Sequence, residues 1–456
     1  PDRSPHPGLF EVKKVYQDLH FTKVGNSQYE LYNENFFVDS SSNDIAWRLI
    51  EDGVVIKTGQ IDVVAQPQNK ASFDLAKQLP KLTAAKEYFI NFYATAKGEH
   101  PLVDKGHLLA SEQILLQKGA VTKFDKNVAG EVTLVKNADS TIVKAGSAKL
   151  IFDNSGYLTS YKHKQTELLK EPLKFNLWRA PTDNDFGGGK KSFVKLAKLW
   201  KDATINQVSQ GIKVLSEKAN SVVLEQTIAL TEAESSVTYQ YTINGVGEVK
   251  VDVAFDFAGD ANAKVKIADV KGKVNKFSAI PRIGTNFQMP VDFAQVTYYG
   301  RGPHENYWDR KTSAFIGIYQ GEVKDIAFDY IRPQENGNRS DLRWATLTNE
   351  QGIGLKISGS PSFDFSAYHQ PMSDYDPGFE KAQRHYTDIV KQDLVSVNVD
   401  FKQTGIAGDN SWGAHAWDKY QLKAKDYSYS FTLTPIDSAP SYETKQTIKI
   451  GTHNEL

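Results

Sequence analysis

The sequence predicts an all-β chain, and three observations support this fold class. Apolar residues recur at every second position over long stretches, which is the period of a strand with one buried face. Aromatic residues make up 11% of the chain, and Val, Thr and Tyr are abundant, as suits half-buried sheets. Helical spacing of apolar residues is scarce. With 40% hydrophobic residues the chain can bury a large core, and its length of 456 residues suggests two or three domains.

The clearest strands form a hairpin in the middle of the chain. Apolar and polar residues alternate over residues 237–243, Asn244-Gly245 begins a turn, and the alternation resumes over residues 249–257. We therefore predict two antiparallel strands there. Residues 150–158 repeat the hairpin signal at smaller scale around Asn154-Ser155-Gly156.

Shorter elements complete the pattern. Strand-like runs lie around residues 29–31, 47–50 and 88–92, between turn-forming residues. One short amphipathic helix is predicted within Lys190–Asp202, where apolar side chains follow the i, i+3, i+4, i+7 spacing. It follows three consecutive glycines at residues 187–189.

We place a domain boundary near Gly119. Residues 8–118 contain enough short strands for one β-sandwich of immunoglobulin size. The strand pattern continues over residues 119–436 without a clear linker, which fits one large sandwich or a pair. Residues 437–456 carry few large apolar groups, so we expect a tail or a link to a further module. The opening residues 1–7 are polar and proline-rich, without Met or a signal-peptide pattern, and suggest a cut inside a longer protein.

Composition excludes several classes of function. The 54 basic and 55 acidic side chains give a net charge of −1, which lacks the basic surplus that nucleic-acid binding requires. Without Cys there is no disulfide, thiolate metal site or Cys nucleophile. No apolar run approaches the roughly 18–20 residues that span a bilayer. No metal-binding spacing such as H-E-x-x-H occurs. We expect neither nucleic acid nor a membrane as partner, and no compartment is indicated.

Paired carboxylates are the residues that sugar hydrolysis requires. Each candidate pair in this chain sits beside Gly, Pro or Asn, so turn-forming or capping roles are the favoured interpretation. The pairs are Asp183/Asp185, Glu305/Asp309 and Asp374/Asp376.

A polar run at residues 300–310 mixes tight-turn residues with charged ones. It could form the floor of a pocket, but we favour a structural ion-pair and hydrogen-bond network, because buried Arg needs such partners. Residues 331–339 and 368–373 are similar runs, and a His within them is interpreted as structural. The predicted network consists of Arg301, His304, Glu305, Asn306, Asp309 and Arg310.

Trp412 is the candidate for ligand binding. It is flanked by small and polar residues, which predicts a loop that presents the indole outward. Indole faces stack on the C–H faces of sugars, and the neighbouring side chains are good partners for hydroxyl groups. The predicted sugar-binding set is Trp412 with Asp409, Asn410 and Ser411. Trp417 is interpreted as an ordinary strand residue.

Four runs in order resemble one known family. Residues 177–185 (Leu-Trp-Arg-Ala-Pro-Thr-Asp-Asn-Asp), 300–310, 333–337 and 409–412 together closely resemble the C-terminal part of the large β-galactosidases of glycoside hydrolase family 2. The opening residues 2–7 resemble the end of that family's catalytic barrel.

The resemblance implies a domain plan. Residues 1–7 would be the trailing edge of the barrel, residues 8–118 an immunoglobulin-like domain, and residues 119–436 a β-supersandwich akin to galactose mutarotases. In that family the upstream barrel carries the catalytic glutamates and the catalytic metal ligands, with Mg²⁺ and Na⁺ bound there. No catalytic residue, metal ligand or cofactor therefore carries over to this chain.

The resemblance also implies a role at the active site. Trp412 matches a tryptophan that serves as a sugar platform. Asp185, Phe186 and Gly187 match a loop that moves when substrate binds, although this loop is shorter than the common family pattern. The implied function is the non-catalytic part of an enzyme that hydrolyses terminal β-D-galactosides with retention. Its partners would be the β-galactoside and the upstream barrel or a large subunit, and a homo-oligomer is compatible with this plan.

Two alternatives stay open. The chain could be a stand-alone carbohydrate-binding protein or the small subunit of a two-chain β-galactosidase. It could also be a mutarotase-like epimerase, which would need an acid and a base in one pocket. His304, Glu305 and His369 are the candidates for that chemistry, but adjacent residues on a strand face opposite ways.

Overall fold

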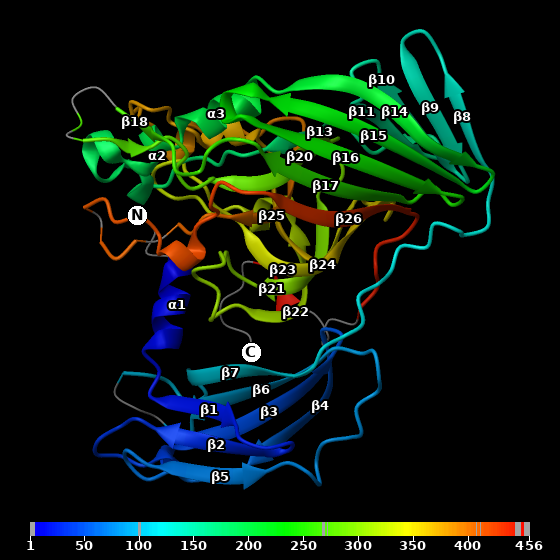
Figure 1. The fold of residues 1–456 in the computed structure, drawn as a ribbon. Helices are drawn as coiled ribbons and strands as arrows, with labels where there is room; N and C mark the ends of the chain where they lie inside the picture. The colour runs from blue at the N-terminus through cyan, green and yellow to red at the C-terminus, as the bar shows by residue number, and fades with distance from the viewer. Residues whose placement is uncertain are drawn as a thin grey trace. The chain divides into compact units, whose positions relative to one another are not determined.

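β-Strands account for most of the regular structure (Figure 1), which confirms the all-β prediction. The chain forms two compact units. The first contains the described residues of Pro1–Val121, Lys311–Ile318 and Tyr442–Ile448, and the second those of Thr122–Arg310, Tyr319–Ser441 and Lys449–Leu456. The computed structural model describes residues 5–98, 102–266, 270, 272–406, 408–410, 412–442 and 448–450. Within these ranges no helix has the length and apolar character needed to cross a membrane.

The first unit is a sandwich of two antiparallel sheets. Aromatic rings from both sheets meet between them: the Phe92 ring centroid lies 5.1 Å from that of Phe21 and 5.0 Å from that of Tyr29. Trp47 is buried in the same core. One sheet has the order β1-β2-β5, formed by Leu19–Lys23, Gln28–Asn33 and Lys70–Asp74. The other has the order β4-β3-β6-β7, formed by Val54–Ile61, Asn43–Glu51, Tyr88–Ala96 and Leu108–Gln117.

A helix that the sequence analysis did not predict precedes this sandwich. α1 spans Pro7–Val15 and is the blue helix in Figure 1. Its signals are Pro7 in the first turn, where a missing N–H is harmless, and Lys14 in the last turn. Residues 1–4 lie outside the described residues, so the interpretation of residues 1–7 as the edge of a barrel stays a prediction.

The predicted central hairpin is confirmed in the second unit. β16 (Ser235–Asn244) and β17 (Val249–Phe257) pair antiparallel, with Tyr239 opposite Val253. Both side chains are buried, as the alternation of apolar and polar residues requires for a sheet with one face in the core. The smaller hairpin around residues 154–156 is confirmed as well, between β10 (Ala148–Asp153) and β11 (Leu158–His163).

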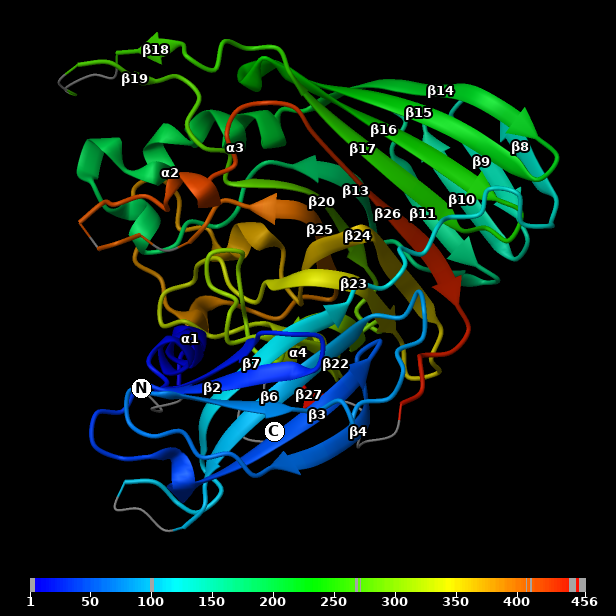
Figure 2. The same cartoon turned by 60° about the horizontal axis from the view of Figure 1, so that its bottom comes forward.

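The second unit is built around one large sheet. Figure 2 shows β14, β15, β16 and β17 side by side. The ring of Phe152, from a smaller sheet, lies 5.2 Å from the ring of Tyr241, so the two sheets pack face to face. The smaller sheet, β12-β11-β10-β9-β8, consists of Thr166–Glu167, Leu158–His163, Ala148–Asp153, Ser140–Ala145 and Val132–Lys136.

The large sheet continues from β17 through strands that come from later in the chain. Within this unit its path, β14-β15-β16-β17-β26-β24-β23-β21, consists of Val208–Lys218, Ser221–Leu230, β16, β17, Tyr427–Ile436, Gly354–Tyr368, Arg339–Thr348 and Gln295–Gly302. Two further strands are β22 (Phe315–Glu322) and β27 (Ile448–Lys449). A branch in the order β13-β20-β25-β24 adds Glu171–Asn176, Arg282–Met289 and Val395–Gln403. β18 (Lys264–Val265) and β19 (Val274–Asn275) form a separate pair.

The helix predicted within Lys190–Asp202 is present in two pieces. α2 spans Phe193–Leu196 and α3 spans Lys198–Ile205, and they are separated at Ala197, which has φ −89° and ψ 4°. A further short helix, α4, spans Val323–Ile326. Single 3₁₀ turns occur at Ser40–Ser42, Asn184–Phe186, Gly189–Lys191, Thr231–Ala233, Met372–Tyr375, Tyr386–Asp388 and Asp418–Tyr420.

Candidate functional site

Trp412 lies on the long loop that follows β25, and its side chain is 88% exposed. The backbone N–H of Trp412 donates to Oδ1 of Asn410 at 2.8 Å, which forms a tight local turn. Asp409 lies on the same loop, and Ser411, the fourth residue of the predicted sugar-binding set, lies outside the described residues. The loop thus holds a large aromatic ring in solvent, with an amide and a carboxylate close in sequence.

The interpretation of Trp417 as a strand residue is wrong. Trp417 precedes the 3₁₀ turn Asp418–Tyr420, its side chain is largely exposed, and its Nε1–H donates to Oδ1 of Asp409 at 2.6 Å. The ammonium of Lys419 lies 5.0 Å from the centre of the indole ring. Polar residues on both sides of Trp417 supply turn and hydrogen-bond partners, which favours a folded-back loop over an extended strand.

Near Gly413 the Trp412 loop contacts the loop of residues 184–191 through closely approaching backbone. Gly413 has φ +110°, and a Cβ there would lie 2.5 Å from both Cα and N of Gly188. A Cβ on Gly187 would lie 2.9 Å from Cα and N of Gly413. Only glycine allows such an approach. The structure therefore brings together two segments that the sequence analysis selected separately.

A buried ion pair anchors the glycine-rich loop. Asp185 accepts from Nη2 of Arg179 at 3.2 Å and from the backbone N–H of Thr182 at 2.8 Å, and its Oδ2 lies 2.9 Å from Nη1 of Arg179. Both charged side chains are buried. Asp183 is exposed and faces Lys381 at 3.0 Å, and the Lys381 ammonium also lies 5.1 Å from the ring centre of Phe186. The two carboxylates of this pair thus have different surroundings, and Asp185 has a structural partner.

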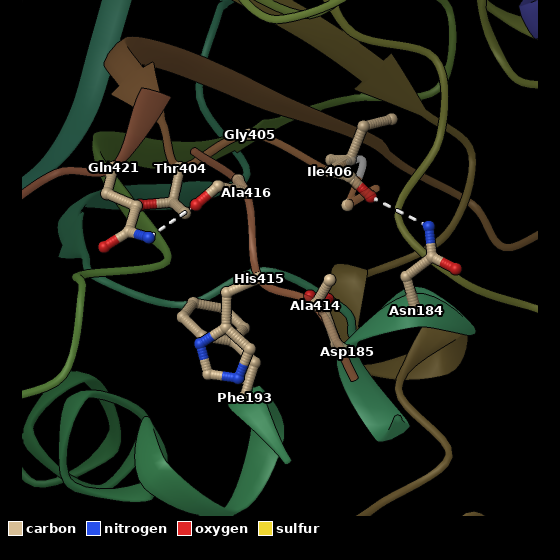
Figure 3. Close-up of a pocket in the computed structure, with 11 residues that line it drawn as sticks. Asn184, Asp185, Phe193, Thr404, Gly405, Ile406, Ala414, His415, Ala416 and Gln421 are labelled. Atoms are coloured by element: carbon tan, nitrogen blue, oxygen red, sulfur yellow. Dashed lines mark hydrogen bonds between the residues drawn. The ribbon is translucent and has the colours of Figure 1, made fainter. Parts of the chain in front are cut away.

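A small cavity lies beneath the two loops (Figure 3). Nδ2 of Asn184 donates to the carbonyl of Ile406 at 3.4 Å across it, and the rings of Phe193 and His415 are 5.8 Å apart. Its volume is about 20 Å³, which is room for about one water molecule. Sites for small molecules usually measure ~300–1,000 Å³, so this cavity is too small to hold a sugar ring.

The polar run at residues 300–310 has dense internal contacts. Glu305 is buried and accepts from Arg310, from the Tyr330 hydroxyl at 2.8 Å and from the backbone N–H of Gly337 at 2.7 Å. Asn306 is buried and accepts at Oδ1 from the backbone N–H of Ser340 at 2.9 Å. These bonds tie the run to the polar segment at residues 331–340.

The remaining residues of the predicted network are placed around this centre. His304 is buried. Nε of Arg301 lies 2.6 Å from Oδ2 of Asp341. The carboxylate of Asp309 lies close to the backbone of Gly405, where a Cβ would be 2.6 Å from its Oδ2. The run therefore reaches the base of the Trp412 loop.

The third pair and His369 have partners elsewhere. Oδ2 of Asp376 accepts from Nε1 of Trp178 at 2.8 Å and from Lys201 at 2.6 Å, while Asp374 accepts from Gln392 at 2.7 Å. Nδ1 of His369 lies 3.0 Å from the carbonyl of Leu394, and burial lowers the pKa of this imidazole. These contacts suit structural roles.

The second unit also contains a buried charged cluster that no sequence pattern predicted. Arg282 is fully buried, with Nη2 3.0 Å from Glu335 and Nε 3.2 Å from Asp400. Burial raises the pKa of Glu335, and it raises that of Asp400 to about 8, although the Arg282 guanidinium acts in the opposite direction on both. No local signal marked this cluster, because Arg282 begins β20 and Asp400 stands at a polar position of the alternating strand β25. Among the described residues no group of three His, Asp or Glu side chains could hold a metal ion.

The chain matches two known domain families. Residues 144–433 match the sequence model of the beta galactosidase small chain. The chain belongs to this family. Residues 29–117 match beta-galactosidase domain 4.

Curated relatives of this family member are whole β-galactosidases. That of Priestia megaterium is 30% identical over 440 residues, which cover 95% of this chain and 40% of the relative. That of Psychromonas ingrahamii is 28% identical over 449 residues, with coverage of 95% and 41%. The chain therefore spans about 40% of the length of the relatives it matches, and the matches fit the C-terminal part of a β-galactosidase.

Solved structures give weaker similarities to this β-galactosidase family member. A galactose 1-epimerase from Lactobacillus acidophilus NCFM aligns with 68% of this chain and 100% of its own, at 8% identity and a TM-score of 0.31. An α-mannosidase from Enterococcus faecalis V583 aligns with 93% of this chain and 42% of its own, at 10% identity and a TM-score of 0.37. Scores this low support no conclusion about fold or function.

Proposed function

We propose that this chain is the non-catalytic C-terminal portion of a retaining β-galactosidase of glycoside hydrolase family 2. In this proposal it supports the catalytic barrel and supplies Trp412 as a stacking platform for the sugar or its aglycone. The observation that carries the proposal is the exposed indole, held by a loop whose backbone packs on the glycine-rich loop. A large aromatic ring kept in water gains free energy when a sugar face covers it.

The surroundings of the carboxylates support a non-catalytic role. Retaining hydrolysis needs one carboxylate as nucleophile and one as acid/base, with their carboxyl groups about 5–5.5 Å apart. In each candidate pair one carboxylate forms an ion pair with a basic side chain. These ion pairs are Asp185–Arg179, Glu305–Arg310 and Asp376–Lys201. The catalytic pair, and the Mg²⁺ and Na⁺ that the family resemblance implies, would belong to the barrel.

Substitution of Trp412 tests the proposal. In the complete β-galactosidase that contains this chain, Trp412→Ala should raise KM for lactose and for a chromogenic galactoside about tenfold, and should lower kcat much less, because stacking contributes about 1–2 kcal/mol of binding. Tyr386→Ala is the control, because this exposed aromatic residue of the same unit begins the separate 3₁₀ turn Tyr386–Asp388 and should leave KM unchanged. An unchanged KM with both substrates contradicts the platform role. The isolated 456-residue chain should show no turnover.

A second arrangement is favoured by the family match itself. The model that matches residues 144–433 is that of a small chain, which suits a two-chain enzyme in which this polypeptide is a separate subunit. Purification from the source cells distinguishes the two arrangements. One long polypeptide in the active fraction supports the single-chain enzyme, and two chains that co-elute support the subunit.

A further inference from the structure

The helix α1 in the first unit has its polar face inward and its apolar face outward. Lys14 is only 8% exposed, because its ammonium bonds the carbonyl of Ser111 and lies 2.7 Å from Glu112. On the opposite side, Leu9, Val12 and Tyr16 fall at the i, i+3, i+7 spacing of one helix face, and Val15 lies beside Val12 at i+6. They are largely exposed: Leu9, Val12, Val15 and Tyr16.

This arrangement is the reverse of an ordinary surface helix, whose apolar stripe faces the core. A second polar contact confirms which side of α1 is inward: the Glu11 carboxylate accepts from the backbone N–H of Thr312 at 3.0 Å and of Ser313 at 2.8 Å, both within the first unit. The outer face of α1 therefore contributes little to the folding of this unit.

A neighbouring loop presents further apolar residues in the same unit. Phe37 is 95% exposed, and Phe36 and Val38 are exposed as well. The loop is held in place from below, because the buried Asn33 side chain donates to the carbonyls of Val38 at 2.9 Å and Ala65 at 3.1 Å. The phenylalanine rings are thus presented by an anchored loop.

A groove joins the helix to this loop. It has a volume of about 540 Å³ and is lined by Val15, Tyr16, Gln17, Asp18, Glu34, Asn35, Phe36 and Phe37. We name the outer face of α1, this groove and Phe36–Val38 the α1–Phe37 surface. Exposed apolar patches of this extent mark sites where proteins bind.

We propose that the α1–Phe37 surface is the docking face for the additional polypeptide that β-galactosidase relatives carry beyond the part matched here. The proposal rests on the proposed function. More than half of each curated relative lies outside the match, and this additional polypeptide is large enough to cover the surface. Any polypeptide joined ahead of α1 reaches this unit at that helix and meets the apolar surface first.

The shape of the surface favours a protein over a sugar. The exposed residues on the outer face of α1 are mainly apolar, and Lys13 is the one exposed cation between Val12 and Tyr16, whereas a sugar needs several polar partners around its ring. Further polar side chains line the groove, where Glu34 already pairs with His20 at 2.8 Å. The fitting partner is a polypeptide with an apolar face that receives the Phe37 ring.

Photocrosslinking tests this assignment. Benzoylphenylalanine is placed at Phe37 in the complete β-galactosidase, and crosslinked peptides are identified by mass spectrometry. Peptides from outside residues 1–456 are expected. The control position is Ile56, an apolar residue that is 45% exposed on β4 of the same unit, where the yield of such peptides should be several-fold lower. Crosslinks to residues 1–456 of the same or a second copy overturn the proposal, as does the absence of any protein crosslink.

A stability measurement separates this proposal from the role of Trp412. Phe37→Ser in the complete enzyme should shorten the half-life of galactosidase activity on heating several-fold without changing KM, while Ile56→Ser should not. Because Phe37 lies in solvent within its own unit, the substitution leaves the fold of that unit intact. Equal half-lives overturn the docking face. If Phe37 crosslinks to peptides outside residues 1–456 but the complete protein has no galactosidase activity, the docking face stands and the proposed function is overturned.

Discussion

Arg282 and Trp412 lie in the same unit, and each departs from the usual rule that charged side chains are exposed and large apolar ones are buried. The guanidinium of Arg282 is fully buried, and the indole of Trp412 is 88% exposed. Two carboxylates account for the buried charge, since Glu335 and Asp400 lie within 3.0 and 3.2 Å of it. Within the part of the chain that the structure describes, no ring or ion contact stabilises the exposed indole of Trp412 in the same way. The structure thus explains the buried residue, whereas the sugar-stacking role of the exposed one is our proposal.

The largest change in the free energy of unfolding is expected when Arg282, the cation of the buried cluster, is removed. Arg282→Met keeps much of the volume but leaves Glu335 and Asp400 without their cation, and the free energy of unfolding should fall by about 3–5 kcal/mol. Arg301→Met is the matched control, because Arg301 pairs with Asp341 near the surface and should cost about 1 kcal/mol or less. Urea unfolding followed by circular dichroism measures both variants. Equal losses of unfolding free energy in the two variants would show that the buried Arg282 cluster stabilises the fold no more than a pair near the surface.

An intermediate effect should depend on pH. Asp400 has a pKa of about 8 in the folded chain against an ordinary value of 3.8. Between about pH 4 and about pH 8 the unfolded carboxyl loses its proton while the folded one keeps it, so stability falls as pH rises, by at most about 1.4 kcal/mol per pH unit.

Asp400→Asn tests this pH dependence, because an amide cannot release the proton. The variant should show a flatter decline in urea midpoint between about pH 5 and about pH 7 than the parent chain. Asp183→Asn, at an exposed carboxylate, should leave the slope unchanged. A variant at Asp400 with the slope of the parent would place the titrating group elsewhere.

The smallest effect concerns the contact that supports the exposed indole. Gly413→Ala puts a Cβ against the backbone of Gly188, at a φ that L residues rarely adopt, and should lower the free energy of unfolding by about 1–3 kcal/mol. Gly189→Ala is the control, since Gly189 also has a positive φ but no atom within 4 Å of the added Cβ. Trp412→Ala should change the unfolding free energy by less than about 0.5 kcal/mol. Equal losses for Gly413→Ala and Gly189→Ala would mean that the loop contact contributes nothing.

The spacing of apolar residues predicted those strands and helices that depend mainly on neighbouring residues. The hairpin of β16 and β17 follows from the alternation of apolar and polar residues within residues 237–257. The helix predicted within residues 190–202 was found in two pieces, because spacing does not reveal a break at Ala197. α1 was missed because its apolar stripe is short and follows a proline-rich start. Trp417 was misassigned because an indole beside Ala resembles a strand residue until Asp409 is seen to bond it.

The sequence by itself determined the all-β class, the main hairpins and the family, because period-two alternation and ordered motifs are properties of neighbouring residues. It also selected Trp412 and the glycines at 187–189 as separate features. Only the tertiary structure decided that Gly413 packs on Gly188, that Arg282 lies between Glu335 and Asp400, and that α1 turns its apolar face outward. Each of these depends on contacts between segments far apart in the chain, and burial and charge pairing are set by such contacts, not by local spacing.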